Sequence, residues 1–241
     1  MREQKLGSLT VRIAGGPDRE GGGDGPVLVL CHGFGAPGTD LVPLFRALRV
    51  EPEVRFVFPM APLVLDPRAP AELAPRAWWM IDMSRLTSAR SEADMIALAK
   101  ETPSGLAAAR EALGGMLEAL EHELSAPPER VVLGGFSQGA MLACDATLRA
   151  ERPPAGLVLL SGAPICEPDW RELAPRRTGM RVLQSHGRAD PILPYAGAEW
   201  LKELLQAGGL DVEFVPFAGG HGIPDSVLER LGPFVETVTG R

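Results

Sequence analysis

The stretch "RVVLGGFSQGAML", from Arg130 to Leu142, places a serine between two glycines exactly where an apolar run has to turn. Serine and glycine are also the residues of ordinary turns, so the pattern alone has two interpretations. One is a plain turn. The other is a nucleophile, Ser137, held on a sharp strand-to-helix turn, for which G-x-S-x-G is typical. The rest of the chain has to decide between them.

Short apolar runs bounded by glycine or proline alternate with helical segments along the chain. The runs expected as strands are 9–14, which alternates like an edge strand, and 26–33, 54–59, 130–136, 156–162, 180–187 and 212–217. The expected helices are 103–124, with Pro103 near its start, 138–150, 196–209 and 224–238. This alternation predicts an α/β fold with a mainly parallel central sheet and helices on both faces.

Segment 60–93 departs from the alternation. It is irregular, rich in proline and alanine, and carries Trp78, Trp79, Met80, Met83 and Leu86. These side chains either cover the core or wall an apolar substrate pocket. No composition break interrupts 100–241, so we expect one domain over 1–241, with 60–93 as a lid-like or substrate-pocket segment.

Composition excludes several classes of function. The net charge is −7 and no basic run occurs, so the footprint of a nucleic-acid-binding protein is missing. The N-terminus lacks the apolar core of a signal peptide, and no run is long enough to span a bilayer, which predicts a cytoplasmic protein. Cys31, Cys144 and Cys166 have no metal-type spacing and are expected as reduced, mostly buried thiols. The composition leaves the oligomeric state open.

A serine hydroxyl needs a neighbouring base, and the chain has four histidines. His122 lies among glutamates on an expected helix and belongs to a solvated face. His32 opens a glycine-rich turn and His186 stands at a strand end, and both are expected to fix their loops. His221 follows a strand and two glycines and precedes the last helix, so it can project over the carboxyl edge of the sheet, where ligands bind. We therefore expect His221 to be the base for Ser137.

The acid that orients such a base is expected at Asp190, in the loop after strand 180–187. Its plain alternative is an Asx turn or a cap for the helix that follows. Asp211 begins a strand and Asp225 suits the start of the last helix, so both are weaker candidates. The resulting order, Ser137, Asp190, His221, is the order of the triad in α/β-hydrolases.

The neighbours of Ser137 have roles under the same interpretation. Gly135 and Gly139 are expected because strand and helix pass too closely at the turn for a side chain. The backbone N–H of Gln138, at the start of a helix, can donate to a reacting carbonyl oxygen. A second donor is expected from the N–H of Phe34. Each such donor contributes on the order of 3 kcal/mol toward a tetrahedral intermediate.

Four stretches together resemble the phospholipase/carboxylesterase family of α/β-hydrolases, which includes acyl-protein thioesterases, lysophospholipases and small bacterial carboxylesterases. They are "LCHGFG" (30–35), "GGFSQGAML" (134–142), "HGRADPILP" (186–194) and "GGHGIPDSVL" (219–228). The resemblance implies the same triad, with Ser137 as nucleophile, and the same two oxyanion donors. It also places an aromatic residue, Trp78 or Trp79, beside an acyl pocket.

The sequence departs from the family pattern in places that concern the substrate. Thioesterase members tend to read H-G-L-G-D, whereas Phe34 stands here for the leucine and Ala36 for the aspartate. Segment 60–93 also matches poorly. These departures leave the catalytic assignment unaffected, but the substrate has to be inferred separately.

The sequence predicts a serine carboxylester hydrolase that acts on short to medium acyl esters through an acyl-enzyme. One alternative is an acyl-protein or acyl-lipid thioesterase or lysophospholipase, and another is a catalytically inactive binding protein of the same fold. The expected partner is a small-molecule acyl ester or thioester. No cofactor is needed, and no cluster of histidine and carboxylate residues has the spacing of metal ligands.

Overall fold

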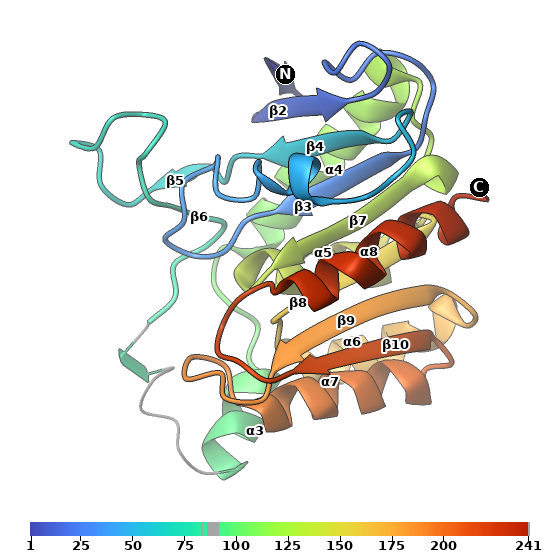
Figure 1. Cartoon of the computed structure of the whole chain (residues 1–241). Coiled ribbons are helices and arrows are strands. Elements are labelled where there is room, and N and C mark those ends of the chain that lie inside the picture. The colour runs from blue at the N-terminus through green and yellow to red at the C-terminus, as the bar shows by residue number, and fades with distance from the viewer. Residues whose placement is uncertain (83, 86–91, 241) are drawn as a thin grey trace.

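A twisted sheet runs through the centre of the computed structural model, which describes residues 1–82, 84–85 and 92–240 (Figure 1). Within these residues the sheet has eight strands, in the order β1-β2-β4-β3-β7-β8-β9-β10. Their bounds are β1 Arg2–Leu6, β2 Leu9–Gly15, β3 Val27–Cys31, β4 Arg55–Pro59, β7 Val131–Phe136, β8 Gly156–Leu160, β9 Arg181–Gly187 and β10 Asp211–Phe217. The six neighbouring strands β4-β3-β7-β8-β9-β10 pair with one another in parallel, as the alternation predicts.

Helices cover both faces of the sheet. On one face α4 (Leu106–Leu124), α5 (Gln138–Arg149), α6 (Glu167–Leu173) and α7 (Tyr195–Ala207) close an apolar cluster. On the other, α8 (Asp225–Val238) and the chain around the short α1 (Leu44–Ala47) close a second cluster. Side chains alternate between the faces, so Val182 belongs to the first cluster and Leu183 to the second. Burial on both faces explains why these strands are continuously apolar.

The outermost strand on the N-terminal side is β1, so the prediction of an edge strand over 9–14 is wrong. β2 lies between β1 and β4, antiparallel to both. Residues 2–5 are polar and carry little strand signal. A tight turn at Gly7 and Ser8 adds this strand to the sheet, with Leu6 opposite Leu9 and Gly7 at φ 56°.

The described part of segment 60–93 contains regular elements that its composition does not predict. β5 (Leu63–Val64) and β6 (Arg76–Ala77) pair antiparallel, and α3 (Glu92–Lys100) follows. β5, β6 and α3 lie along the edge where the parallel strands end (Figure 1). Met83 and Leu86 lie outside the described residues. The predicted start of helix 103–124 is three residues too early, because Gly105, at φ 92°, directly precedes α4.

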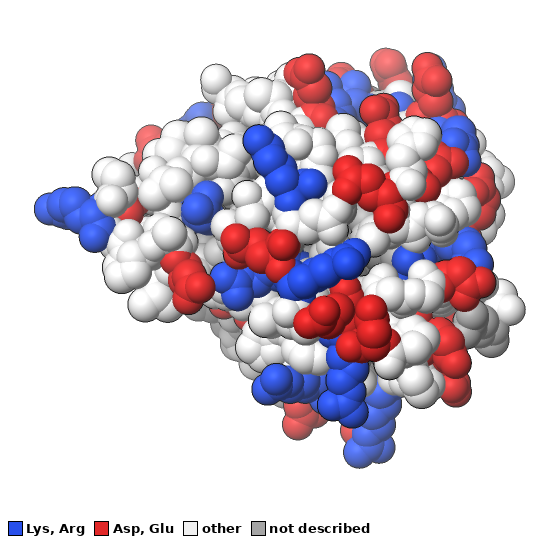
Figure 2. Space-filling model, turned by 90° about the horizontal axis from the view of Figure 1, so that it is seen from above, with Lys and Arg blue, Asp and Glu red and all other residues white. Residues whose placement is uncertain are grey.

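The surface carries charges of both signs. Figure 2 shows acidic and basic side chains interspersed on one face, without a large field of one sign. Several of them pair, as Arg12 does with Glu3 at 3.2 Å. In the part of the chain that the structure describes, no helix is both long and apolar enough to cross a bilayer.

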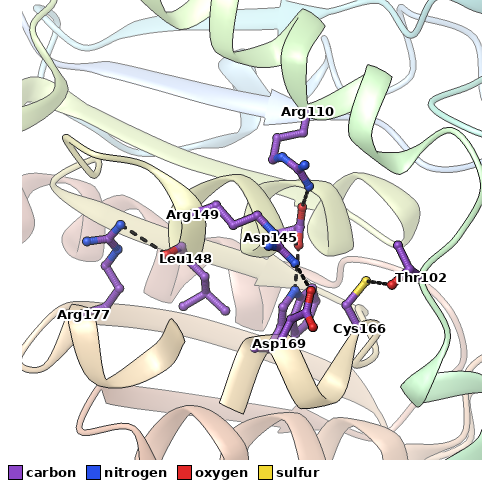
Figure 3. A network of polar contacts seen from close by, with 9 residues as sticks. Thr102, Arg110, Asp145, Leu148, Arg149, Cys166, Asp169 and Arg177 are labelled. Carbon is purple, nitrogen blue, oxygen red and sulfur yellow. Dashed lines mark hydrogen bonds and ion pairs between the residues drawn. The ribbon is translucent and has the colours of Figure 1, made fainter. Parts of the chain in front are cut away.

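A buried carboxylate anchors α5 to its neighbours (Figure 3). Asp145 is fully buried and accepts hydrogen bonds from Arg110 of α4 at 2.5 Å and from Arg149 at 2.9 Å. The indole Nε1–H of Trp170, on α6, donates to the same carboxylate at 2.9 Å. Arg149 also pairs with Asp169 at 2.5 Å. Because charges in the interior need such partners, this network fixes the helix that begins directly after Ser137.

Candidate active site

Ser137 lies on a strained turn between β7 and α5. Its backbone has φ 54° and ψ −117°, a conformation that residues with a Cβ rarely adopt. The Ser137 N–H donates to Leu160 O of the neighbouring β8 at 2.8 Å, which holds the turn at the carboxyl edge of the sheet. The structure therefore has the sharp strand-to-helix turn that the sequence predicts, with the serine at its apex.

Gly135 and Gly139 are required by close packing at this turn. A Cβ on Gly139 would lie 2.0 Å from Cys31 O, and one on Gly135 would lie 2.4 Å from the carbonyl carbon of Gly139. Both distances are far shorter than van der Waals contact. Any larger residue at either position would push α5 away from β3 and β7, so the predicted steric reason for these glycines agrees with the structure.

Gln138 holds the turn to segment 60–93 through its side chain. Its Oε1 accepts from the Trp78 N–H at 3.0 Å, and its Nε2–H donates to Trp79 O at 2.8 Å. The sequence predicts a role for the backbone of Gln138 only and gives no signal for this side-chain contact. The backbone N–H remains in the first turn of α5, where N–H groups have no partner within the helix.

The loop of Phe34 lies next to Ser137. A Cβ on Gly33 would be 3.3 Å from Ser137 Cβ. The loop is tied to β6, because the Gly35 N–H donates to Arg76 O at 2.8 Å and the Arg76 N–H donates to Ala36 O at 3.0 Å. Within the described residues the Phe34 N–H makes no hydrogen bond, so it is available as a donor.

Asp190 and His221 form a hydrogen-bonded pair. Asp190 Oδ2 accepts from His221 Nδ1 at 2.7 Å, while Oδ1 accepts from the N–H groups of Ile192 and Leu193 at 2.8 and 2.9 Å. Burial acts to raise the pKa of Asp190, but hydrogen bonds from His186, His221 and the two N–H groups outweigh it. The pKa therefore lies well below the ordinary value, and the carboxylate stays ionised. Asp190 therefore makes both predicted contacts, the Asx turn through Oδ1 and the pair with His221 through Oδ2.

His221 lies next to the serine turn. Its ring centroid is 4.7 Å from that of Phe136, the residue before Ser137. Ser161, at φ 50° directly after β8, donates through Oγ to Gly222 O at 3.3 Å and so braces the loop of His221. Among the described residues Ser137 Oγ makes no hydrogen bond. Catalytic hydrogen bonds often tighten only when substrate binds.

The weaker acid candidates lie elsewhere. Asp211 begins β10, at the opposite end of the strand from the loop of His221, and is 3.7 Å from Arg181. Asp225 is in the first turn of α8. The three cysteines are free and buried, and burial raises their thiol pKa values. The residues described in the structure contain no group of three or more metal-binding side chains.

His32 has the structural role that its sequence position predicts. Its Nδ1–H donates to Gly33 O at 2.9 Å, and its Nε2 accepts from the Ala61 N–H at 3.1 Å. Burial lowers the pKa of His32 to about 4. Protonation of Nε2 would break the bond from Ala61, so the folded chain keeps this ring neutral.

We therefore expect the free energy of unfolding to fall as the pH drops from about 6.5 to about 4. Unfolded His32 takes up a proton near pH 6.5 and folded His32 only near 4, so the unfolded state binds more protons between these values. The contribution is on the order of 3 kcal/mol. Urea unfolding of the wild type and of His32→Asn, at pH 7.5 and 5, isolates it. Equal losses in the two proteins would contradict the assignment.

The comparison with known families gives the same result as the geometry. Residues 21–239 match the family model described as phospholipase/carboxylesterase. The chain belongs to the phospholipase/carboxylesterase family. The fold predicted from the sequence, that of the α/β-hydrolases, is thereby confirmed, and the chain is an enzyme of the carboxylesterase and thioesterase type.

Individual relatives in this family match over most of their length. Acyl-protein thioesterase 1 of Neurospora crassa is 26% identical over 89% of the chain and 86% of the relative. That of Eremothecium gossypii is 29% identical, covering 86% of each. Among solved structures, the esterase PE8 superposes with a TM-score of 0.76 at 26% identity, over 95% of the chain and 99% of PE8.

Proposed function

We propose that the chain is a serine carboxylester hydrolase that acts on short to medium acyl esters. Ser137 is the nucleophile, His221 the general base and Asp190 the acid that orients it. The observation that carries the proposal is the 2.7 Å hydrogen bond between Asp190 and His221 beside a serine in a strained turn conformation. Backbone strain of this kind costs free energy and is concentrated at active sites, where the surrounding structure holds it in place.

The geometry supports a two-step reaction. His221 Nε2 takes the proton of Ser137 as Oγ attacks the acyl carbon, and the Nδ1–H remains bonded to Asp190. The N–H groups of Gln138 and Phe34 donate to the oxyanion of the tetrahedral intermediate. His221 then gives its proton to the leaving oxygen, and an acyl-enzyme remains. A water molecule, activated by the same histidine, releases the acid. The reaction needs no cofactor.

An apolar cavity of about 300 Å³ is the proposed acyl site. Its walls come from segment 60–93, α3, residues 101–104, the start of α5, the loops after β8 and β9 and the start of α7, with Trp79, Met80, Met141, Ile165 and Leu193 among the lining residues. Ser137 and His221 do not line it, so the proposal places the acyl chain behind Trp79 and Met141, next to the serine turn. Trp78 is not among them, because its indole Nε1–H donates to His32 O under the oxyanion loop. Of the three predicted substrate contacts, the proposal therefore keeps Trp79 and Met80. The volume is at the lower end for ligand sites, which favours short acyl chains.

A thioester substrate is the second candidate, because two matched relatives are named acyl-protein thioesterases. The same atoms would perform that reaction, with a thiolate as leaving group. The cavity volume limits the length of the acyl chain, and it carries no information on whether the leaving group is an alcohol or a thiol. An inactive binding protein is the remaining alternative, and labelling of the wild-type serine by a fluorophosphonate probe would exclude it.

We expect kcat/KM to be highest for short to medium chains in a series of p-nitrophenyl esters. Each methylene bound in the cavity contributes up to ~0.8 kcal/mol, but only while the walls leave room for it. The measurement is kcat/KM from two-carbon to sixteen-carbon acyl groups, beside acyl-thioesters of the same lengths. Preference for long-chain thioesters would contradict the proposal and support the thioesterase.

Trp79→Ala and Trp78→Ala form a matched pair for this series. Trp79 lines the cavity, so its removal should shift the optimum toward longer chains. Trp78 packs away from the cavity, so its removal should lower activity at every length and leave the optimum in place. A shift of the optimum in Trp78→Ala alone would mean that the acyl chain lies elsewhere.

A further inference from the structure

His186 contacts the proposed acid Asp190 from a fully buried position on β9. Its Nε2 is 2.9 Å from Leu193 O and 3.3 Å from Asp190 Oδ2. A carbonyl oxygen can only accept, so Nε2 carries a hydrogen that it donates to Leu193 O, and Asp190 Oδ2 lies beside the same N–H. The sequence predicts only that His186 fixes its loop. In the structure it also contacts the carboxylate of the proposed catalytic acid.

The contacts of His186 close a ring around the carboxylate. Leu193 donates its N–H to Asp190 Oδ1 and accepts through its carbonyl from His186, which also faces Oδ2. Two ring nitrogens therefore face Oδ2, His221 Nδ1 at 2.7 Å and His186 Nε2 at 3.3 Å, and Oδ1 has two backbone donors. With both oxygens held, the carboxyl plane cannot rotate away from His221.

The imidazole of His186 is itself held by its neighbours. Its ring lies edge-on to Tyr195, the first residue of α7, with centroids 6.3 Å apart. Tyr195 packs on Phe214 of β10, and the guanidinium of Arg188 lies 4.9 Å from the centroid of the Tyr195 ring. Nδ1 of His186 is buried and has no partner among the described residues. All its hydrogen bonding is therefore directed, through Nε2, at the loop of Asp190.

We propose that His186 is a positioning residue that acts through Asp190, fixing Oδ2 toward His221. The inference rests on the proposed function, because it assigns a task in that triad. The competing role is a plain brace, in which His186 only holds Leu193 O and keeps the loop folded. If His186 acts through Asp190, its replacement lowers turnover only while the Asp190 carboxylate is present. A plain brace lowers turnover whether or not that carboxylate is present.

Two substitutions separate the donor from the packing. His186→Gln places an amide N–H near the position of Nε2, whereas His186→Met fills a similar volume without a donor. Loss of a group that orients a catalytic residue typically costs 10–100-fold, so we expect His186→Met to lower kcat by about that factor, with KM little changed. His186→Gln should recover most of the loss. Turnover is expressed per site labelled by a fluorophosphonate probe, so that unfolded protein is not counted.

The decisive measurement is a double-mutant cycle with Asp190→Ala. If His186 acts through Asp190, then adding His186→Met to Asp190→Ala should leave kcat unchanged. A plain brace would lower kcat by the same factor in both backgrounds, and that result would overturn the proposal. If His186→Met does not fold, His186→Asn replaces it in the cycle, because its amide is too short to reach Oδ2.

The outcomes also distinguish this inference from the proposed function. If Asp190→Ala keeps full activity, the triad assignment itself is wrong. If Asp190→Ala is impaired but His186→Met is as active as the wild type, the triad stands and the role of His186 is refuted. Equal loss in His186→Gln and His186→Met would likewise refute it, since the donor would then have no effect.

Discussion

Ser137→Ala is expected to lower kcat by about 10⁶-fold, the size of effect seen when a triad serine is removed from a serine hydrolase. The hydroxyl makes no hydrogen bond among the described residues, so its loss removes chemistry and little packing. The strained backbone at φ 54° remains in the variant, since alanine also has a Cβ. The fold should therefore persist while turnover disappears.

Ser137→Gly is the matched control for this prediction. It also removes the hydroxyl, but glycine adopts a positive φ without the cost that a Cβ brings, so its free energy of unfolding should exceed that of Ser137→Ala by about 1 kcal/mol. Both variants should fail to react with a fluorophosphonate probe that labels the wild type. Retained labelling in either would show that another residue is the nucleophile. Equal stability of the two would show that the turn is not strained.

The parallel part of the fold was predictable because burial on both faces leaves a clear signal. β3 reads VLVLC and β7 reads VVLGGF, and every residue of β3 is buried. Such runs end at one edge of a sheet, so the polar residues after them had to meet there. That reasoning alone brought Asp190 and His221 together, and the structure joins them at 2.7 Å.

The parts that sequence reasoning missed depend on contacts between distant residues. β1 is polar and joins the sheet through a turn rather than through apolar periodicity. Trp78 and Trp79 are adjacent and chemically identical, and only the fold shows that one lines the cavity while the other supports His32. His186, the second histidine beside Asp190, was visible as a histidine at the end of a strand. The sequence did not show that its side chain faces the carboxylate of Asp190.

Asp190→Asn is expected to lower kcat by on the order of 10³–10⁴, because it imposes the wrong tautomer on His221. The N–H groups of Ile192 and Leu193 both point at Oδ1, so the amide oxygen of the variant must occupy that position. Its NH₂ group then faces His221 Nδ1 as a donor. Nδ1 can accept only if it loses its hydrogen, which moves to Nε2, and Nε2 can then no longer take the proton of Ser137.

Asp211→Asn and Asp225→Asn are the controls for this effect, because each removes one carboxylate that lies away from His221. Both should keep kcat close to that of the wild type. Combining Asp190→Asn with Ser137→Ala should cost no more than Ser137→Ala alone, since the orientation of His221 matters only while a serine proton has to be removed. Full activity in Asp190→Asn together with a large loss in Asp225→Asn would transfer the acid to α8. The hydrogen bonds on Asp190 predict the opposite: His221 is oriented by the carboxylate to which it is bonded, and both oxygens of that carboxylate are held in place.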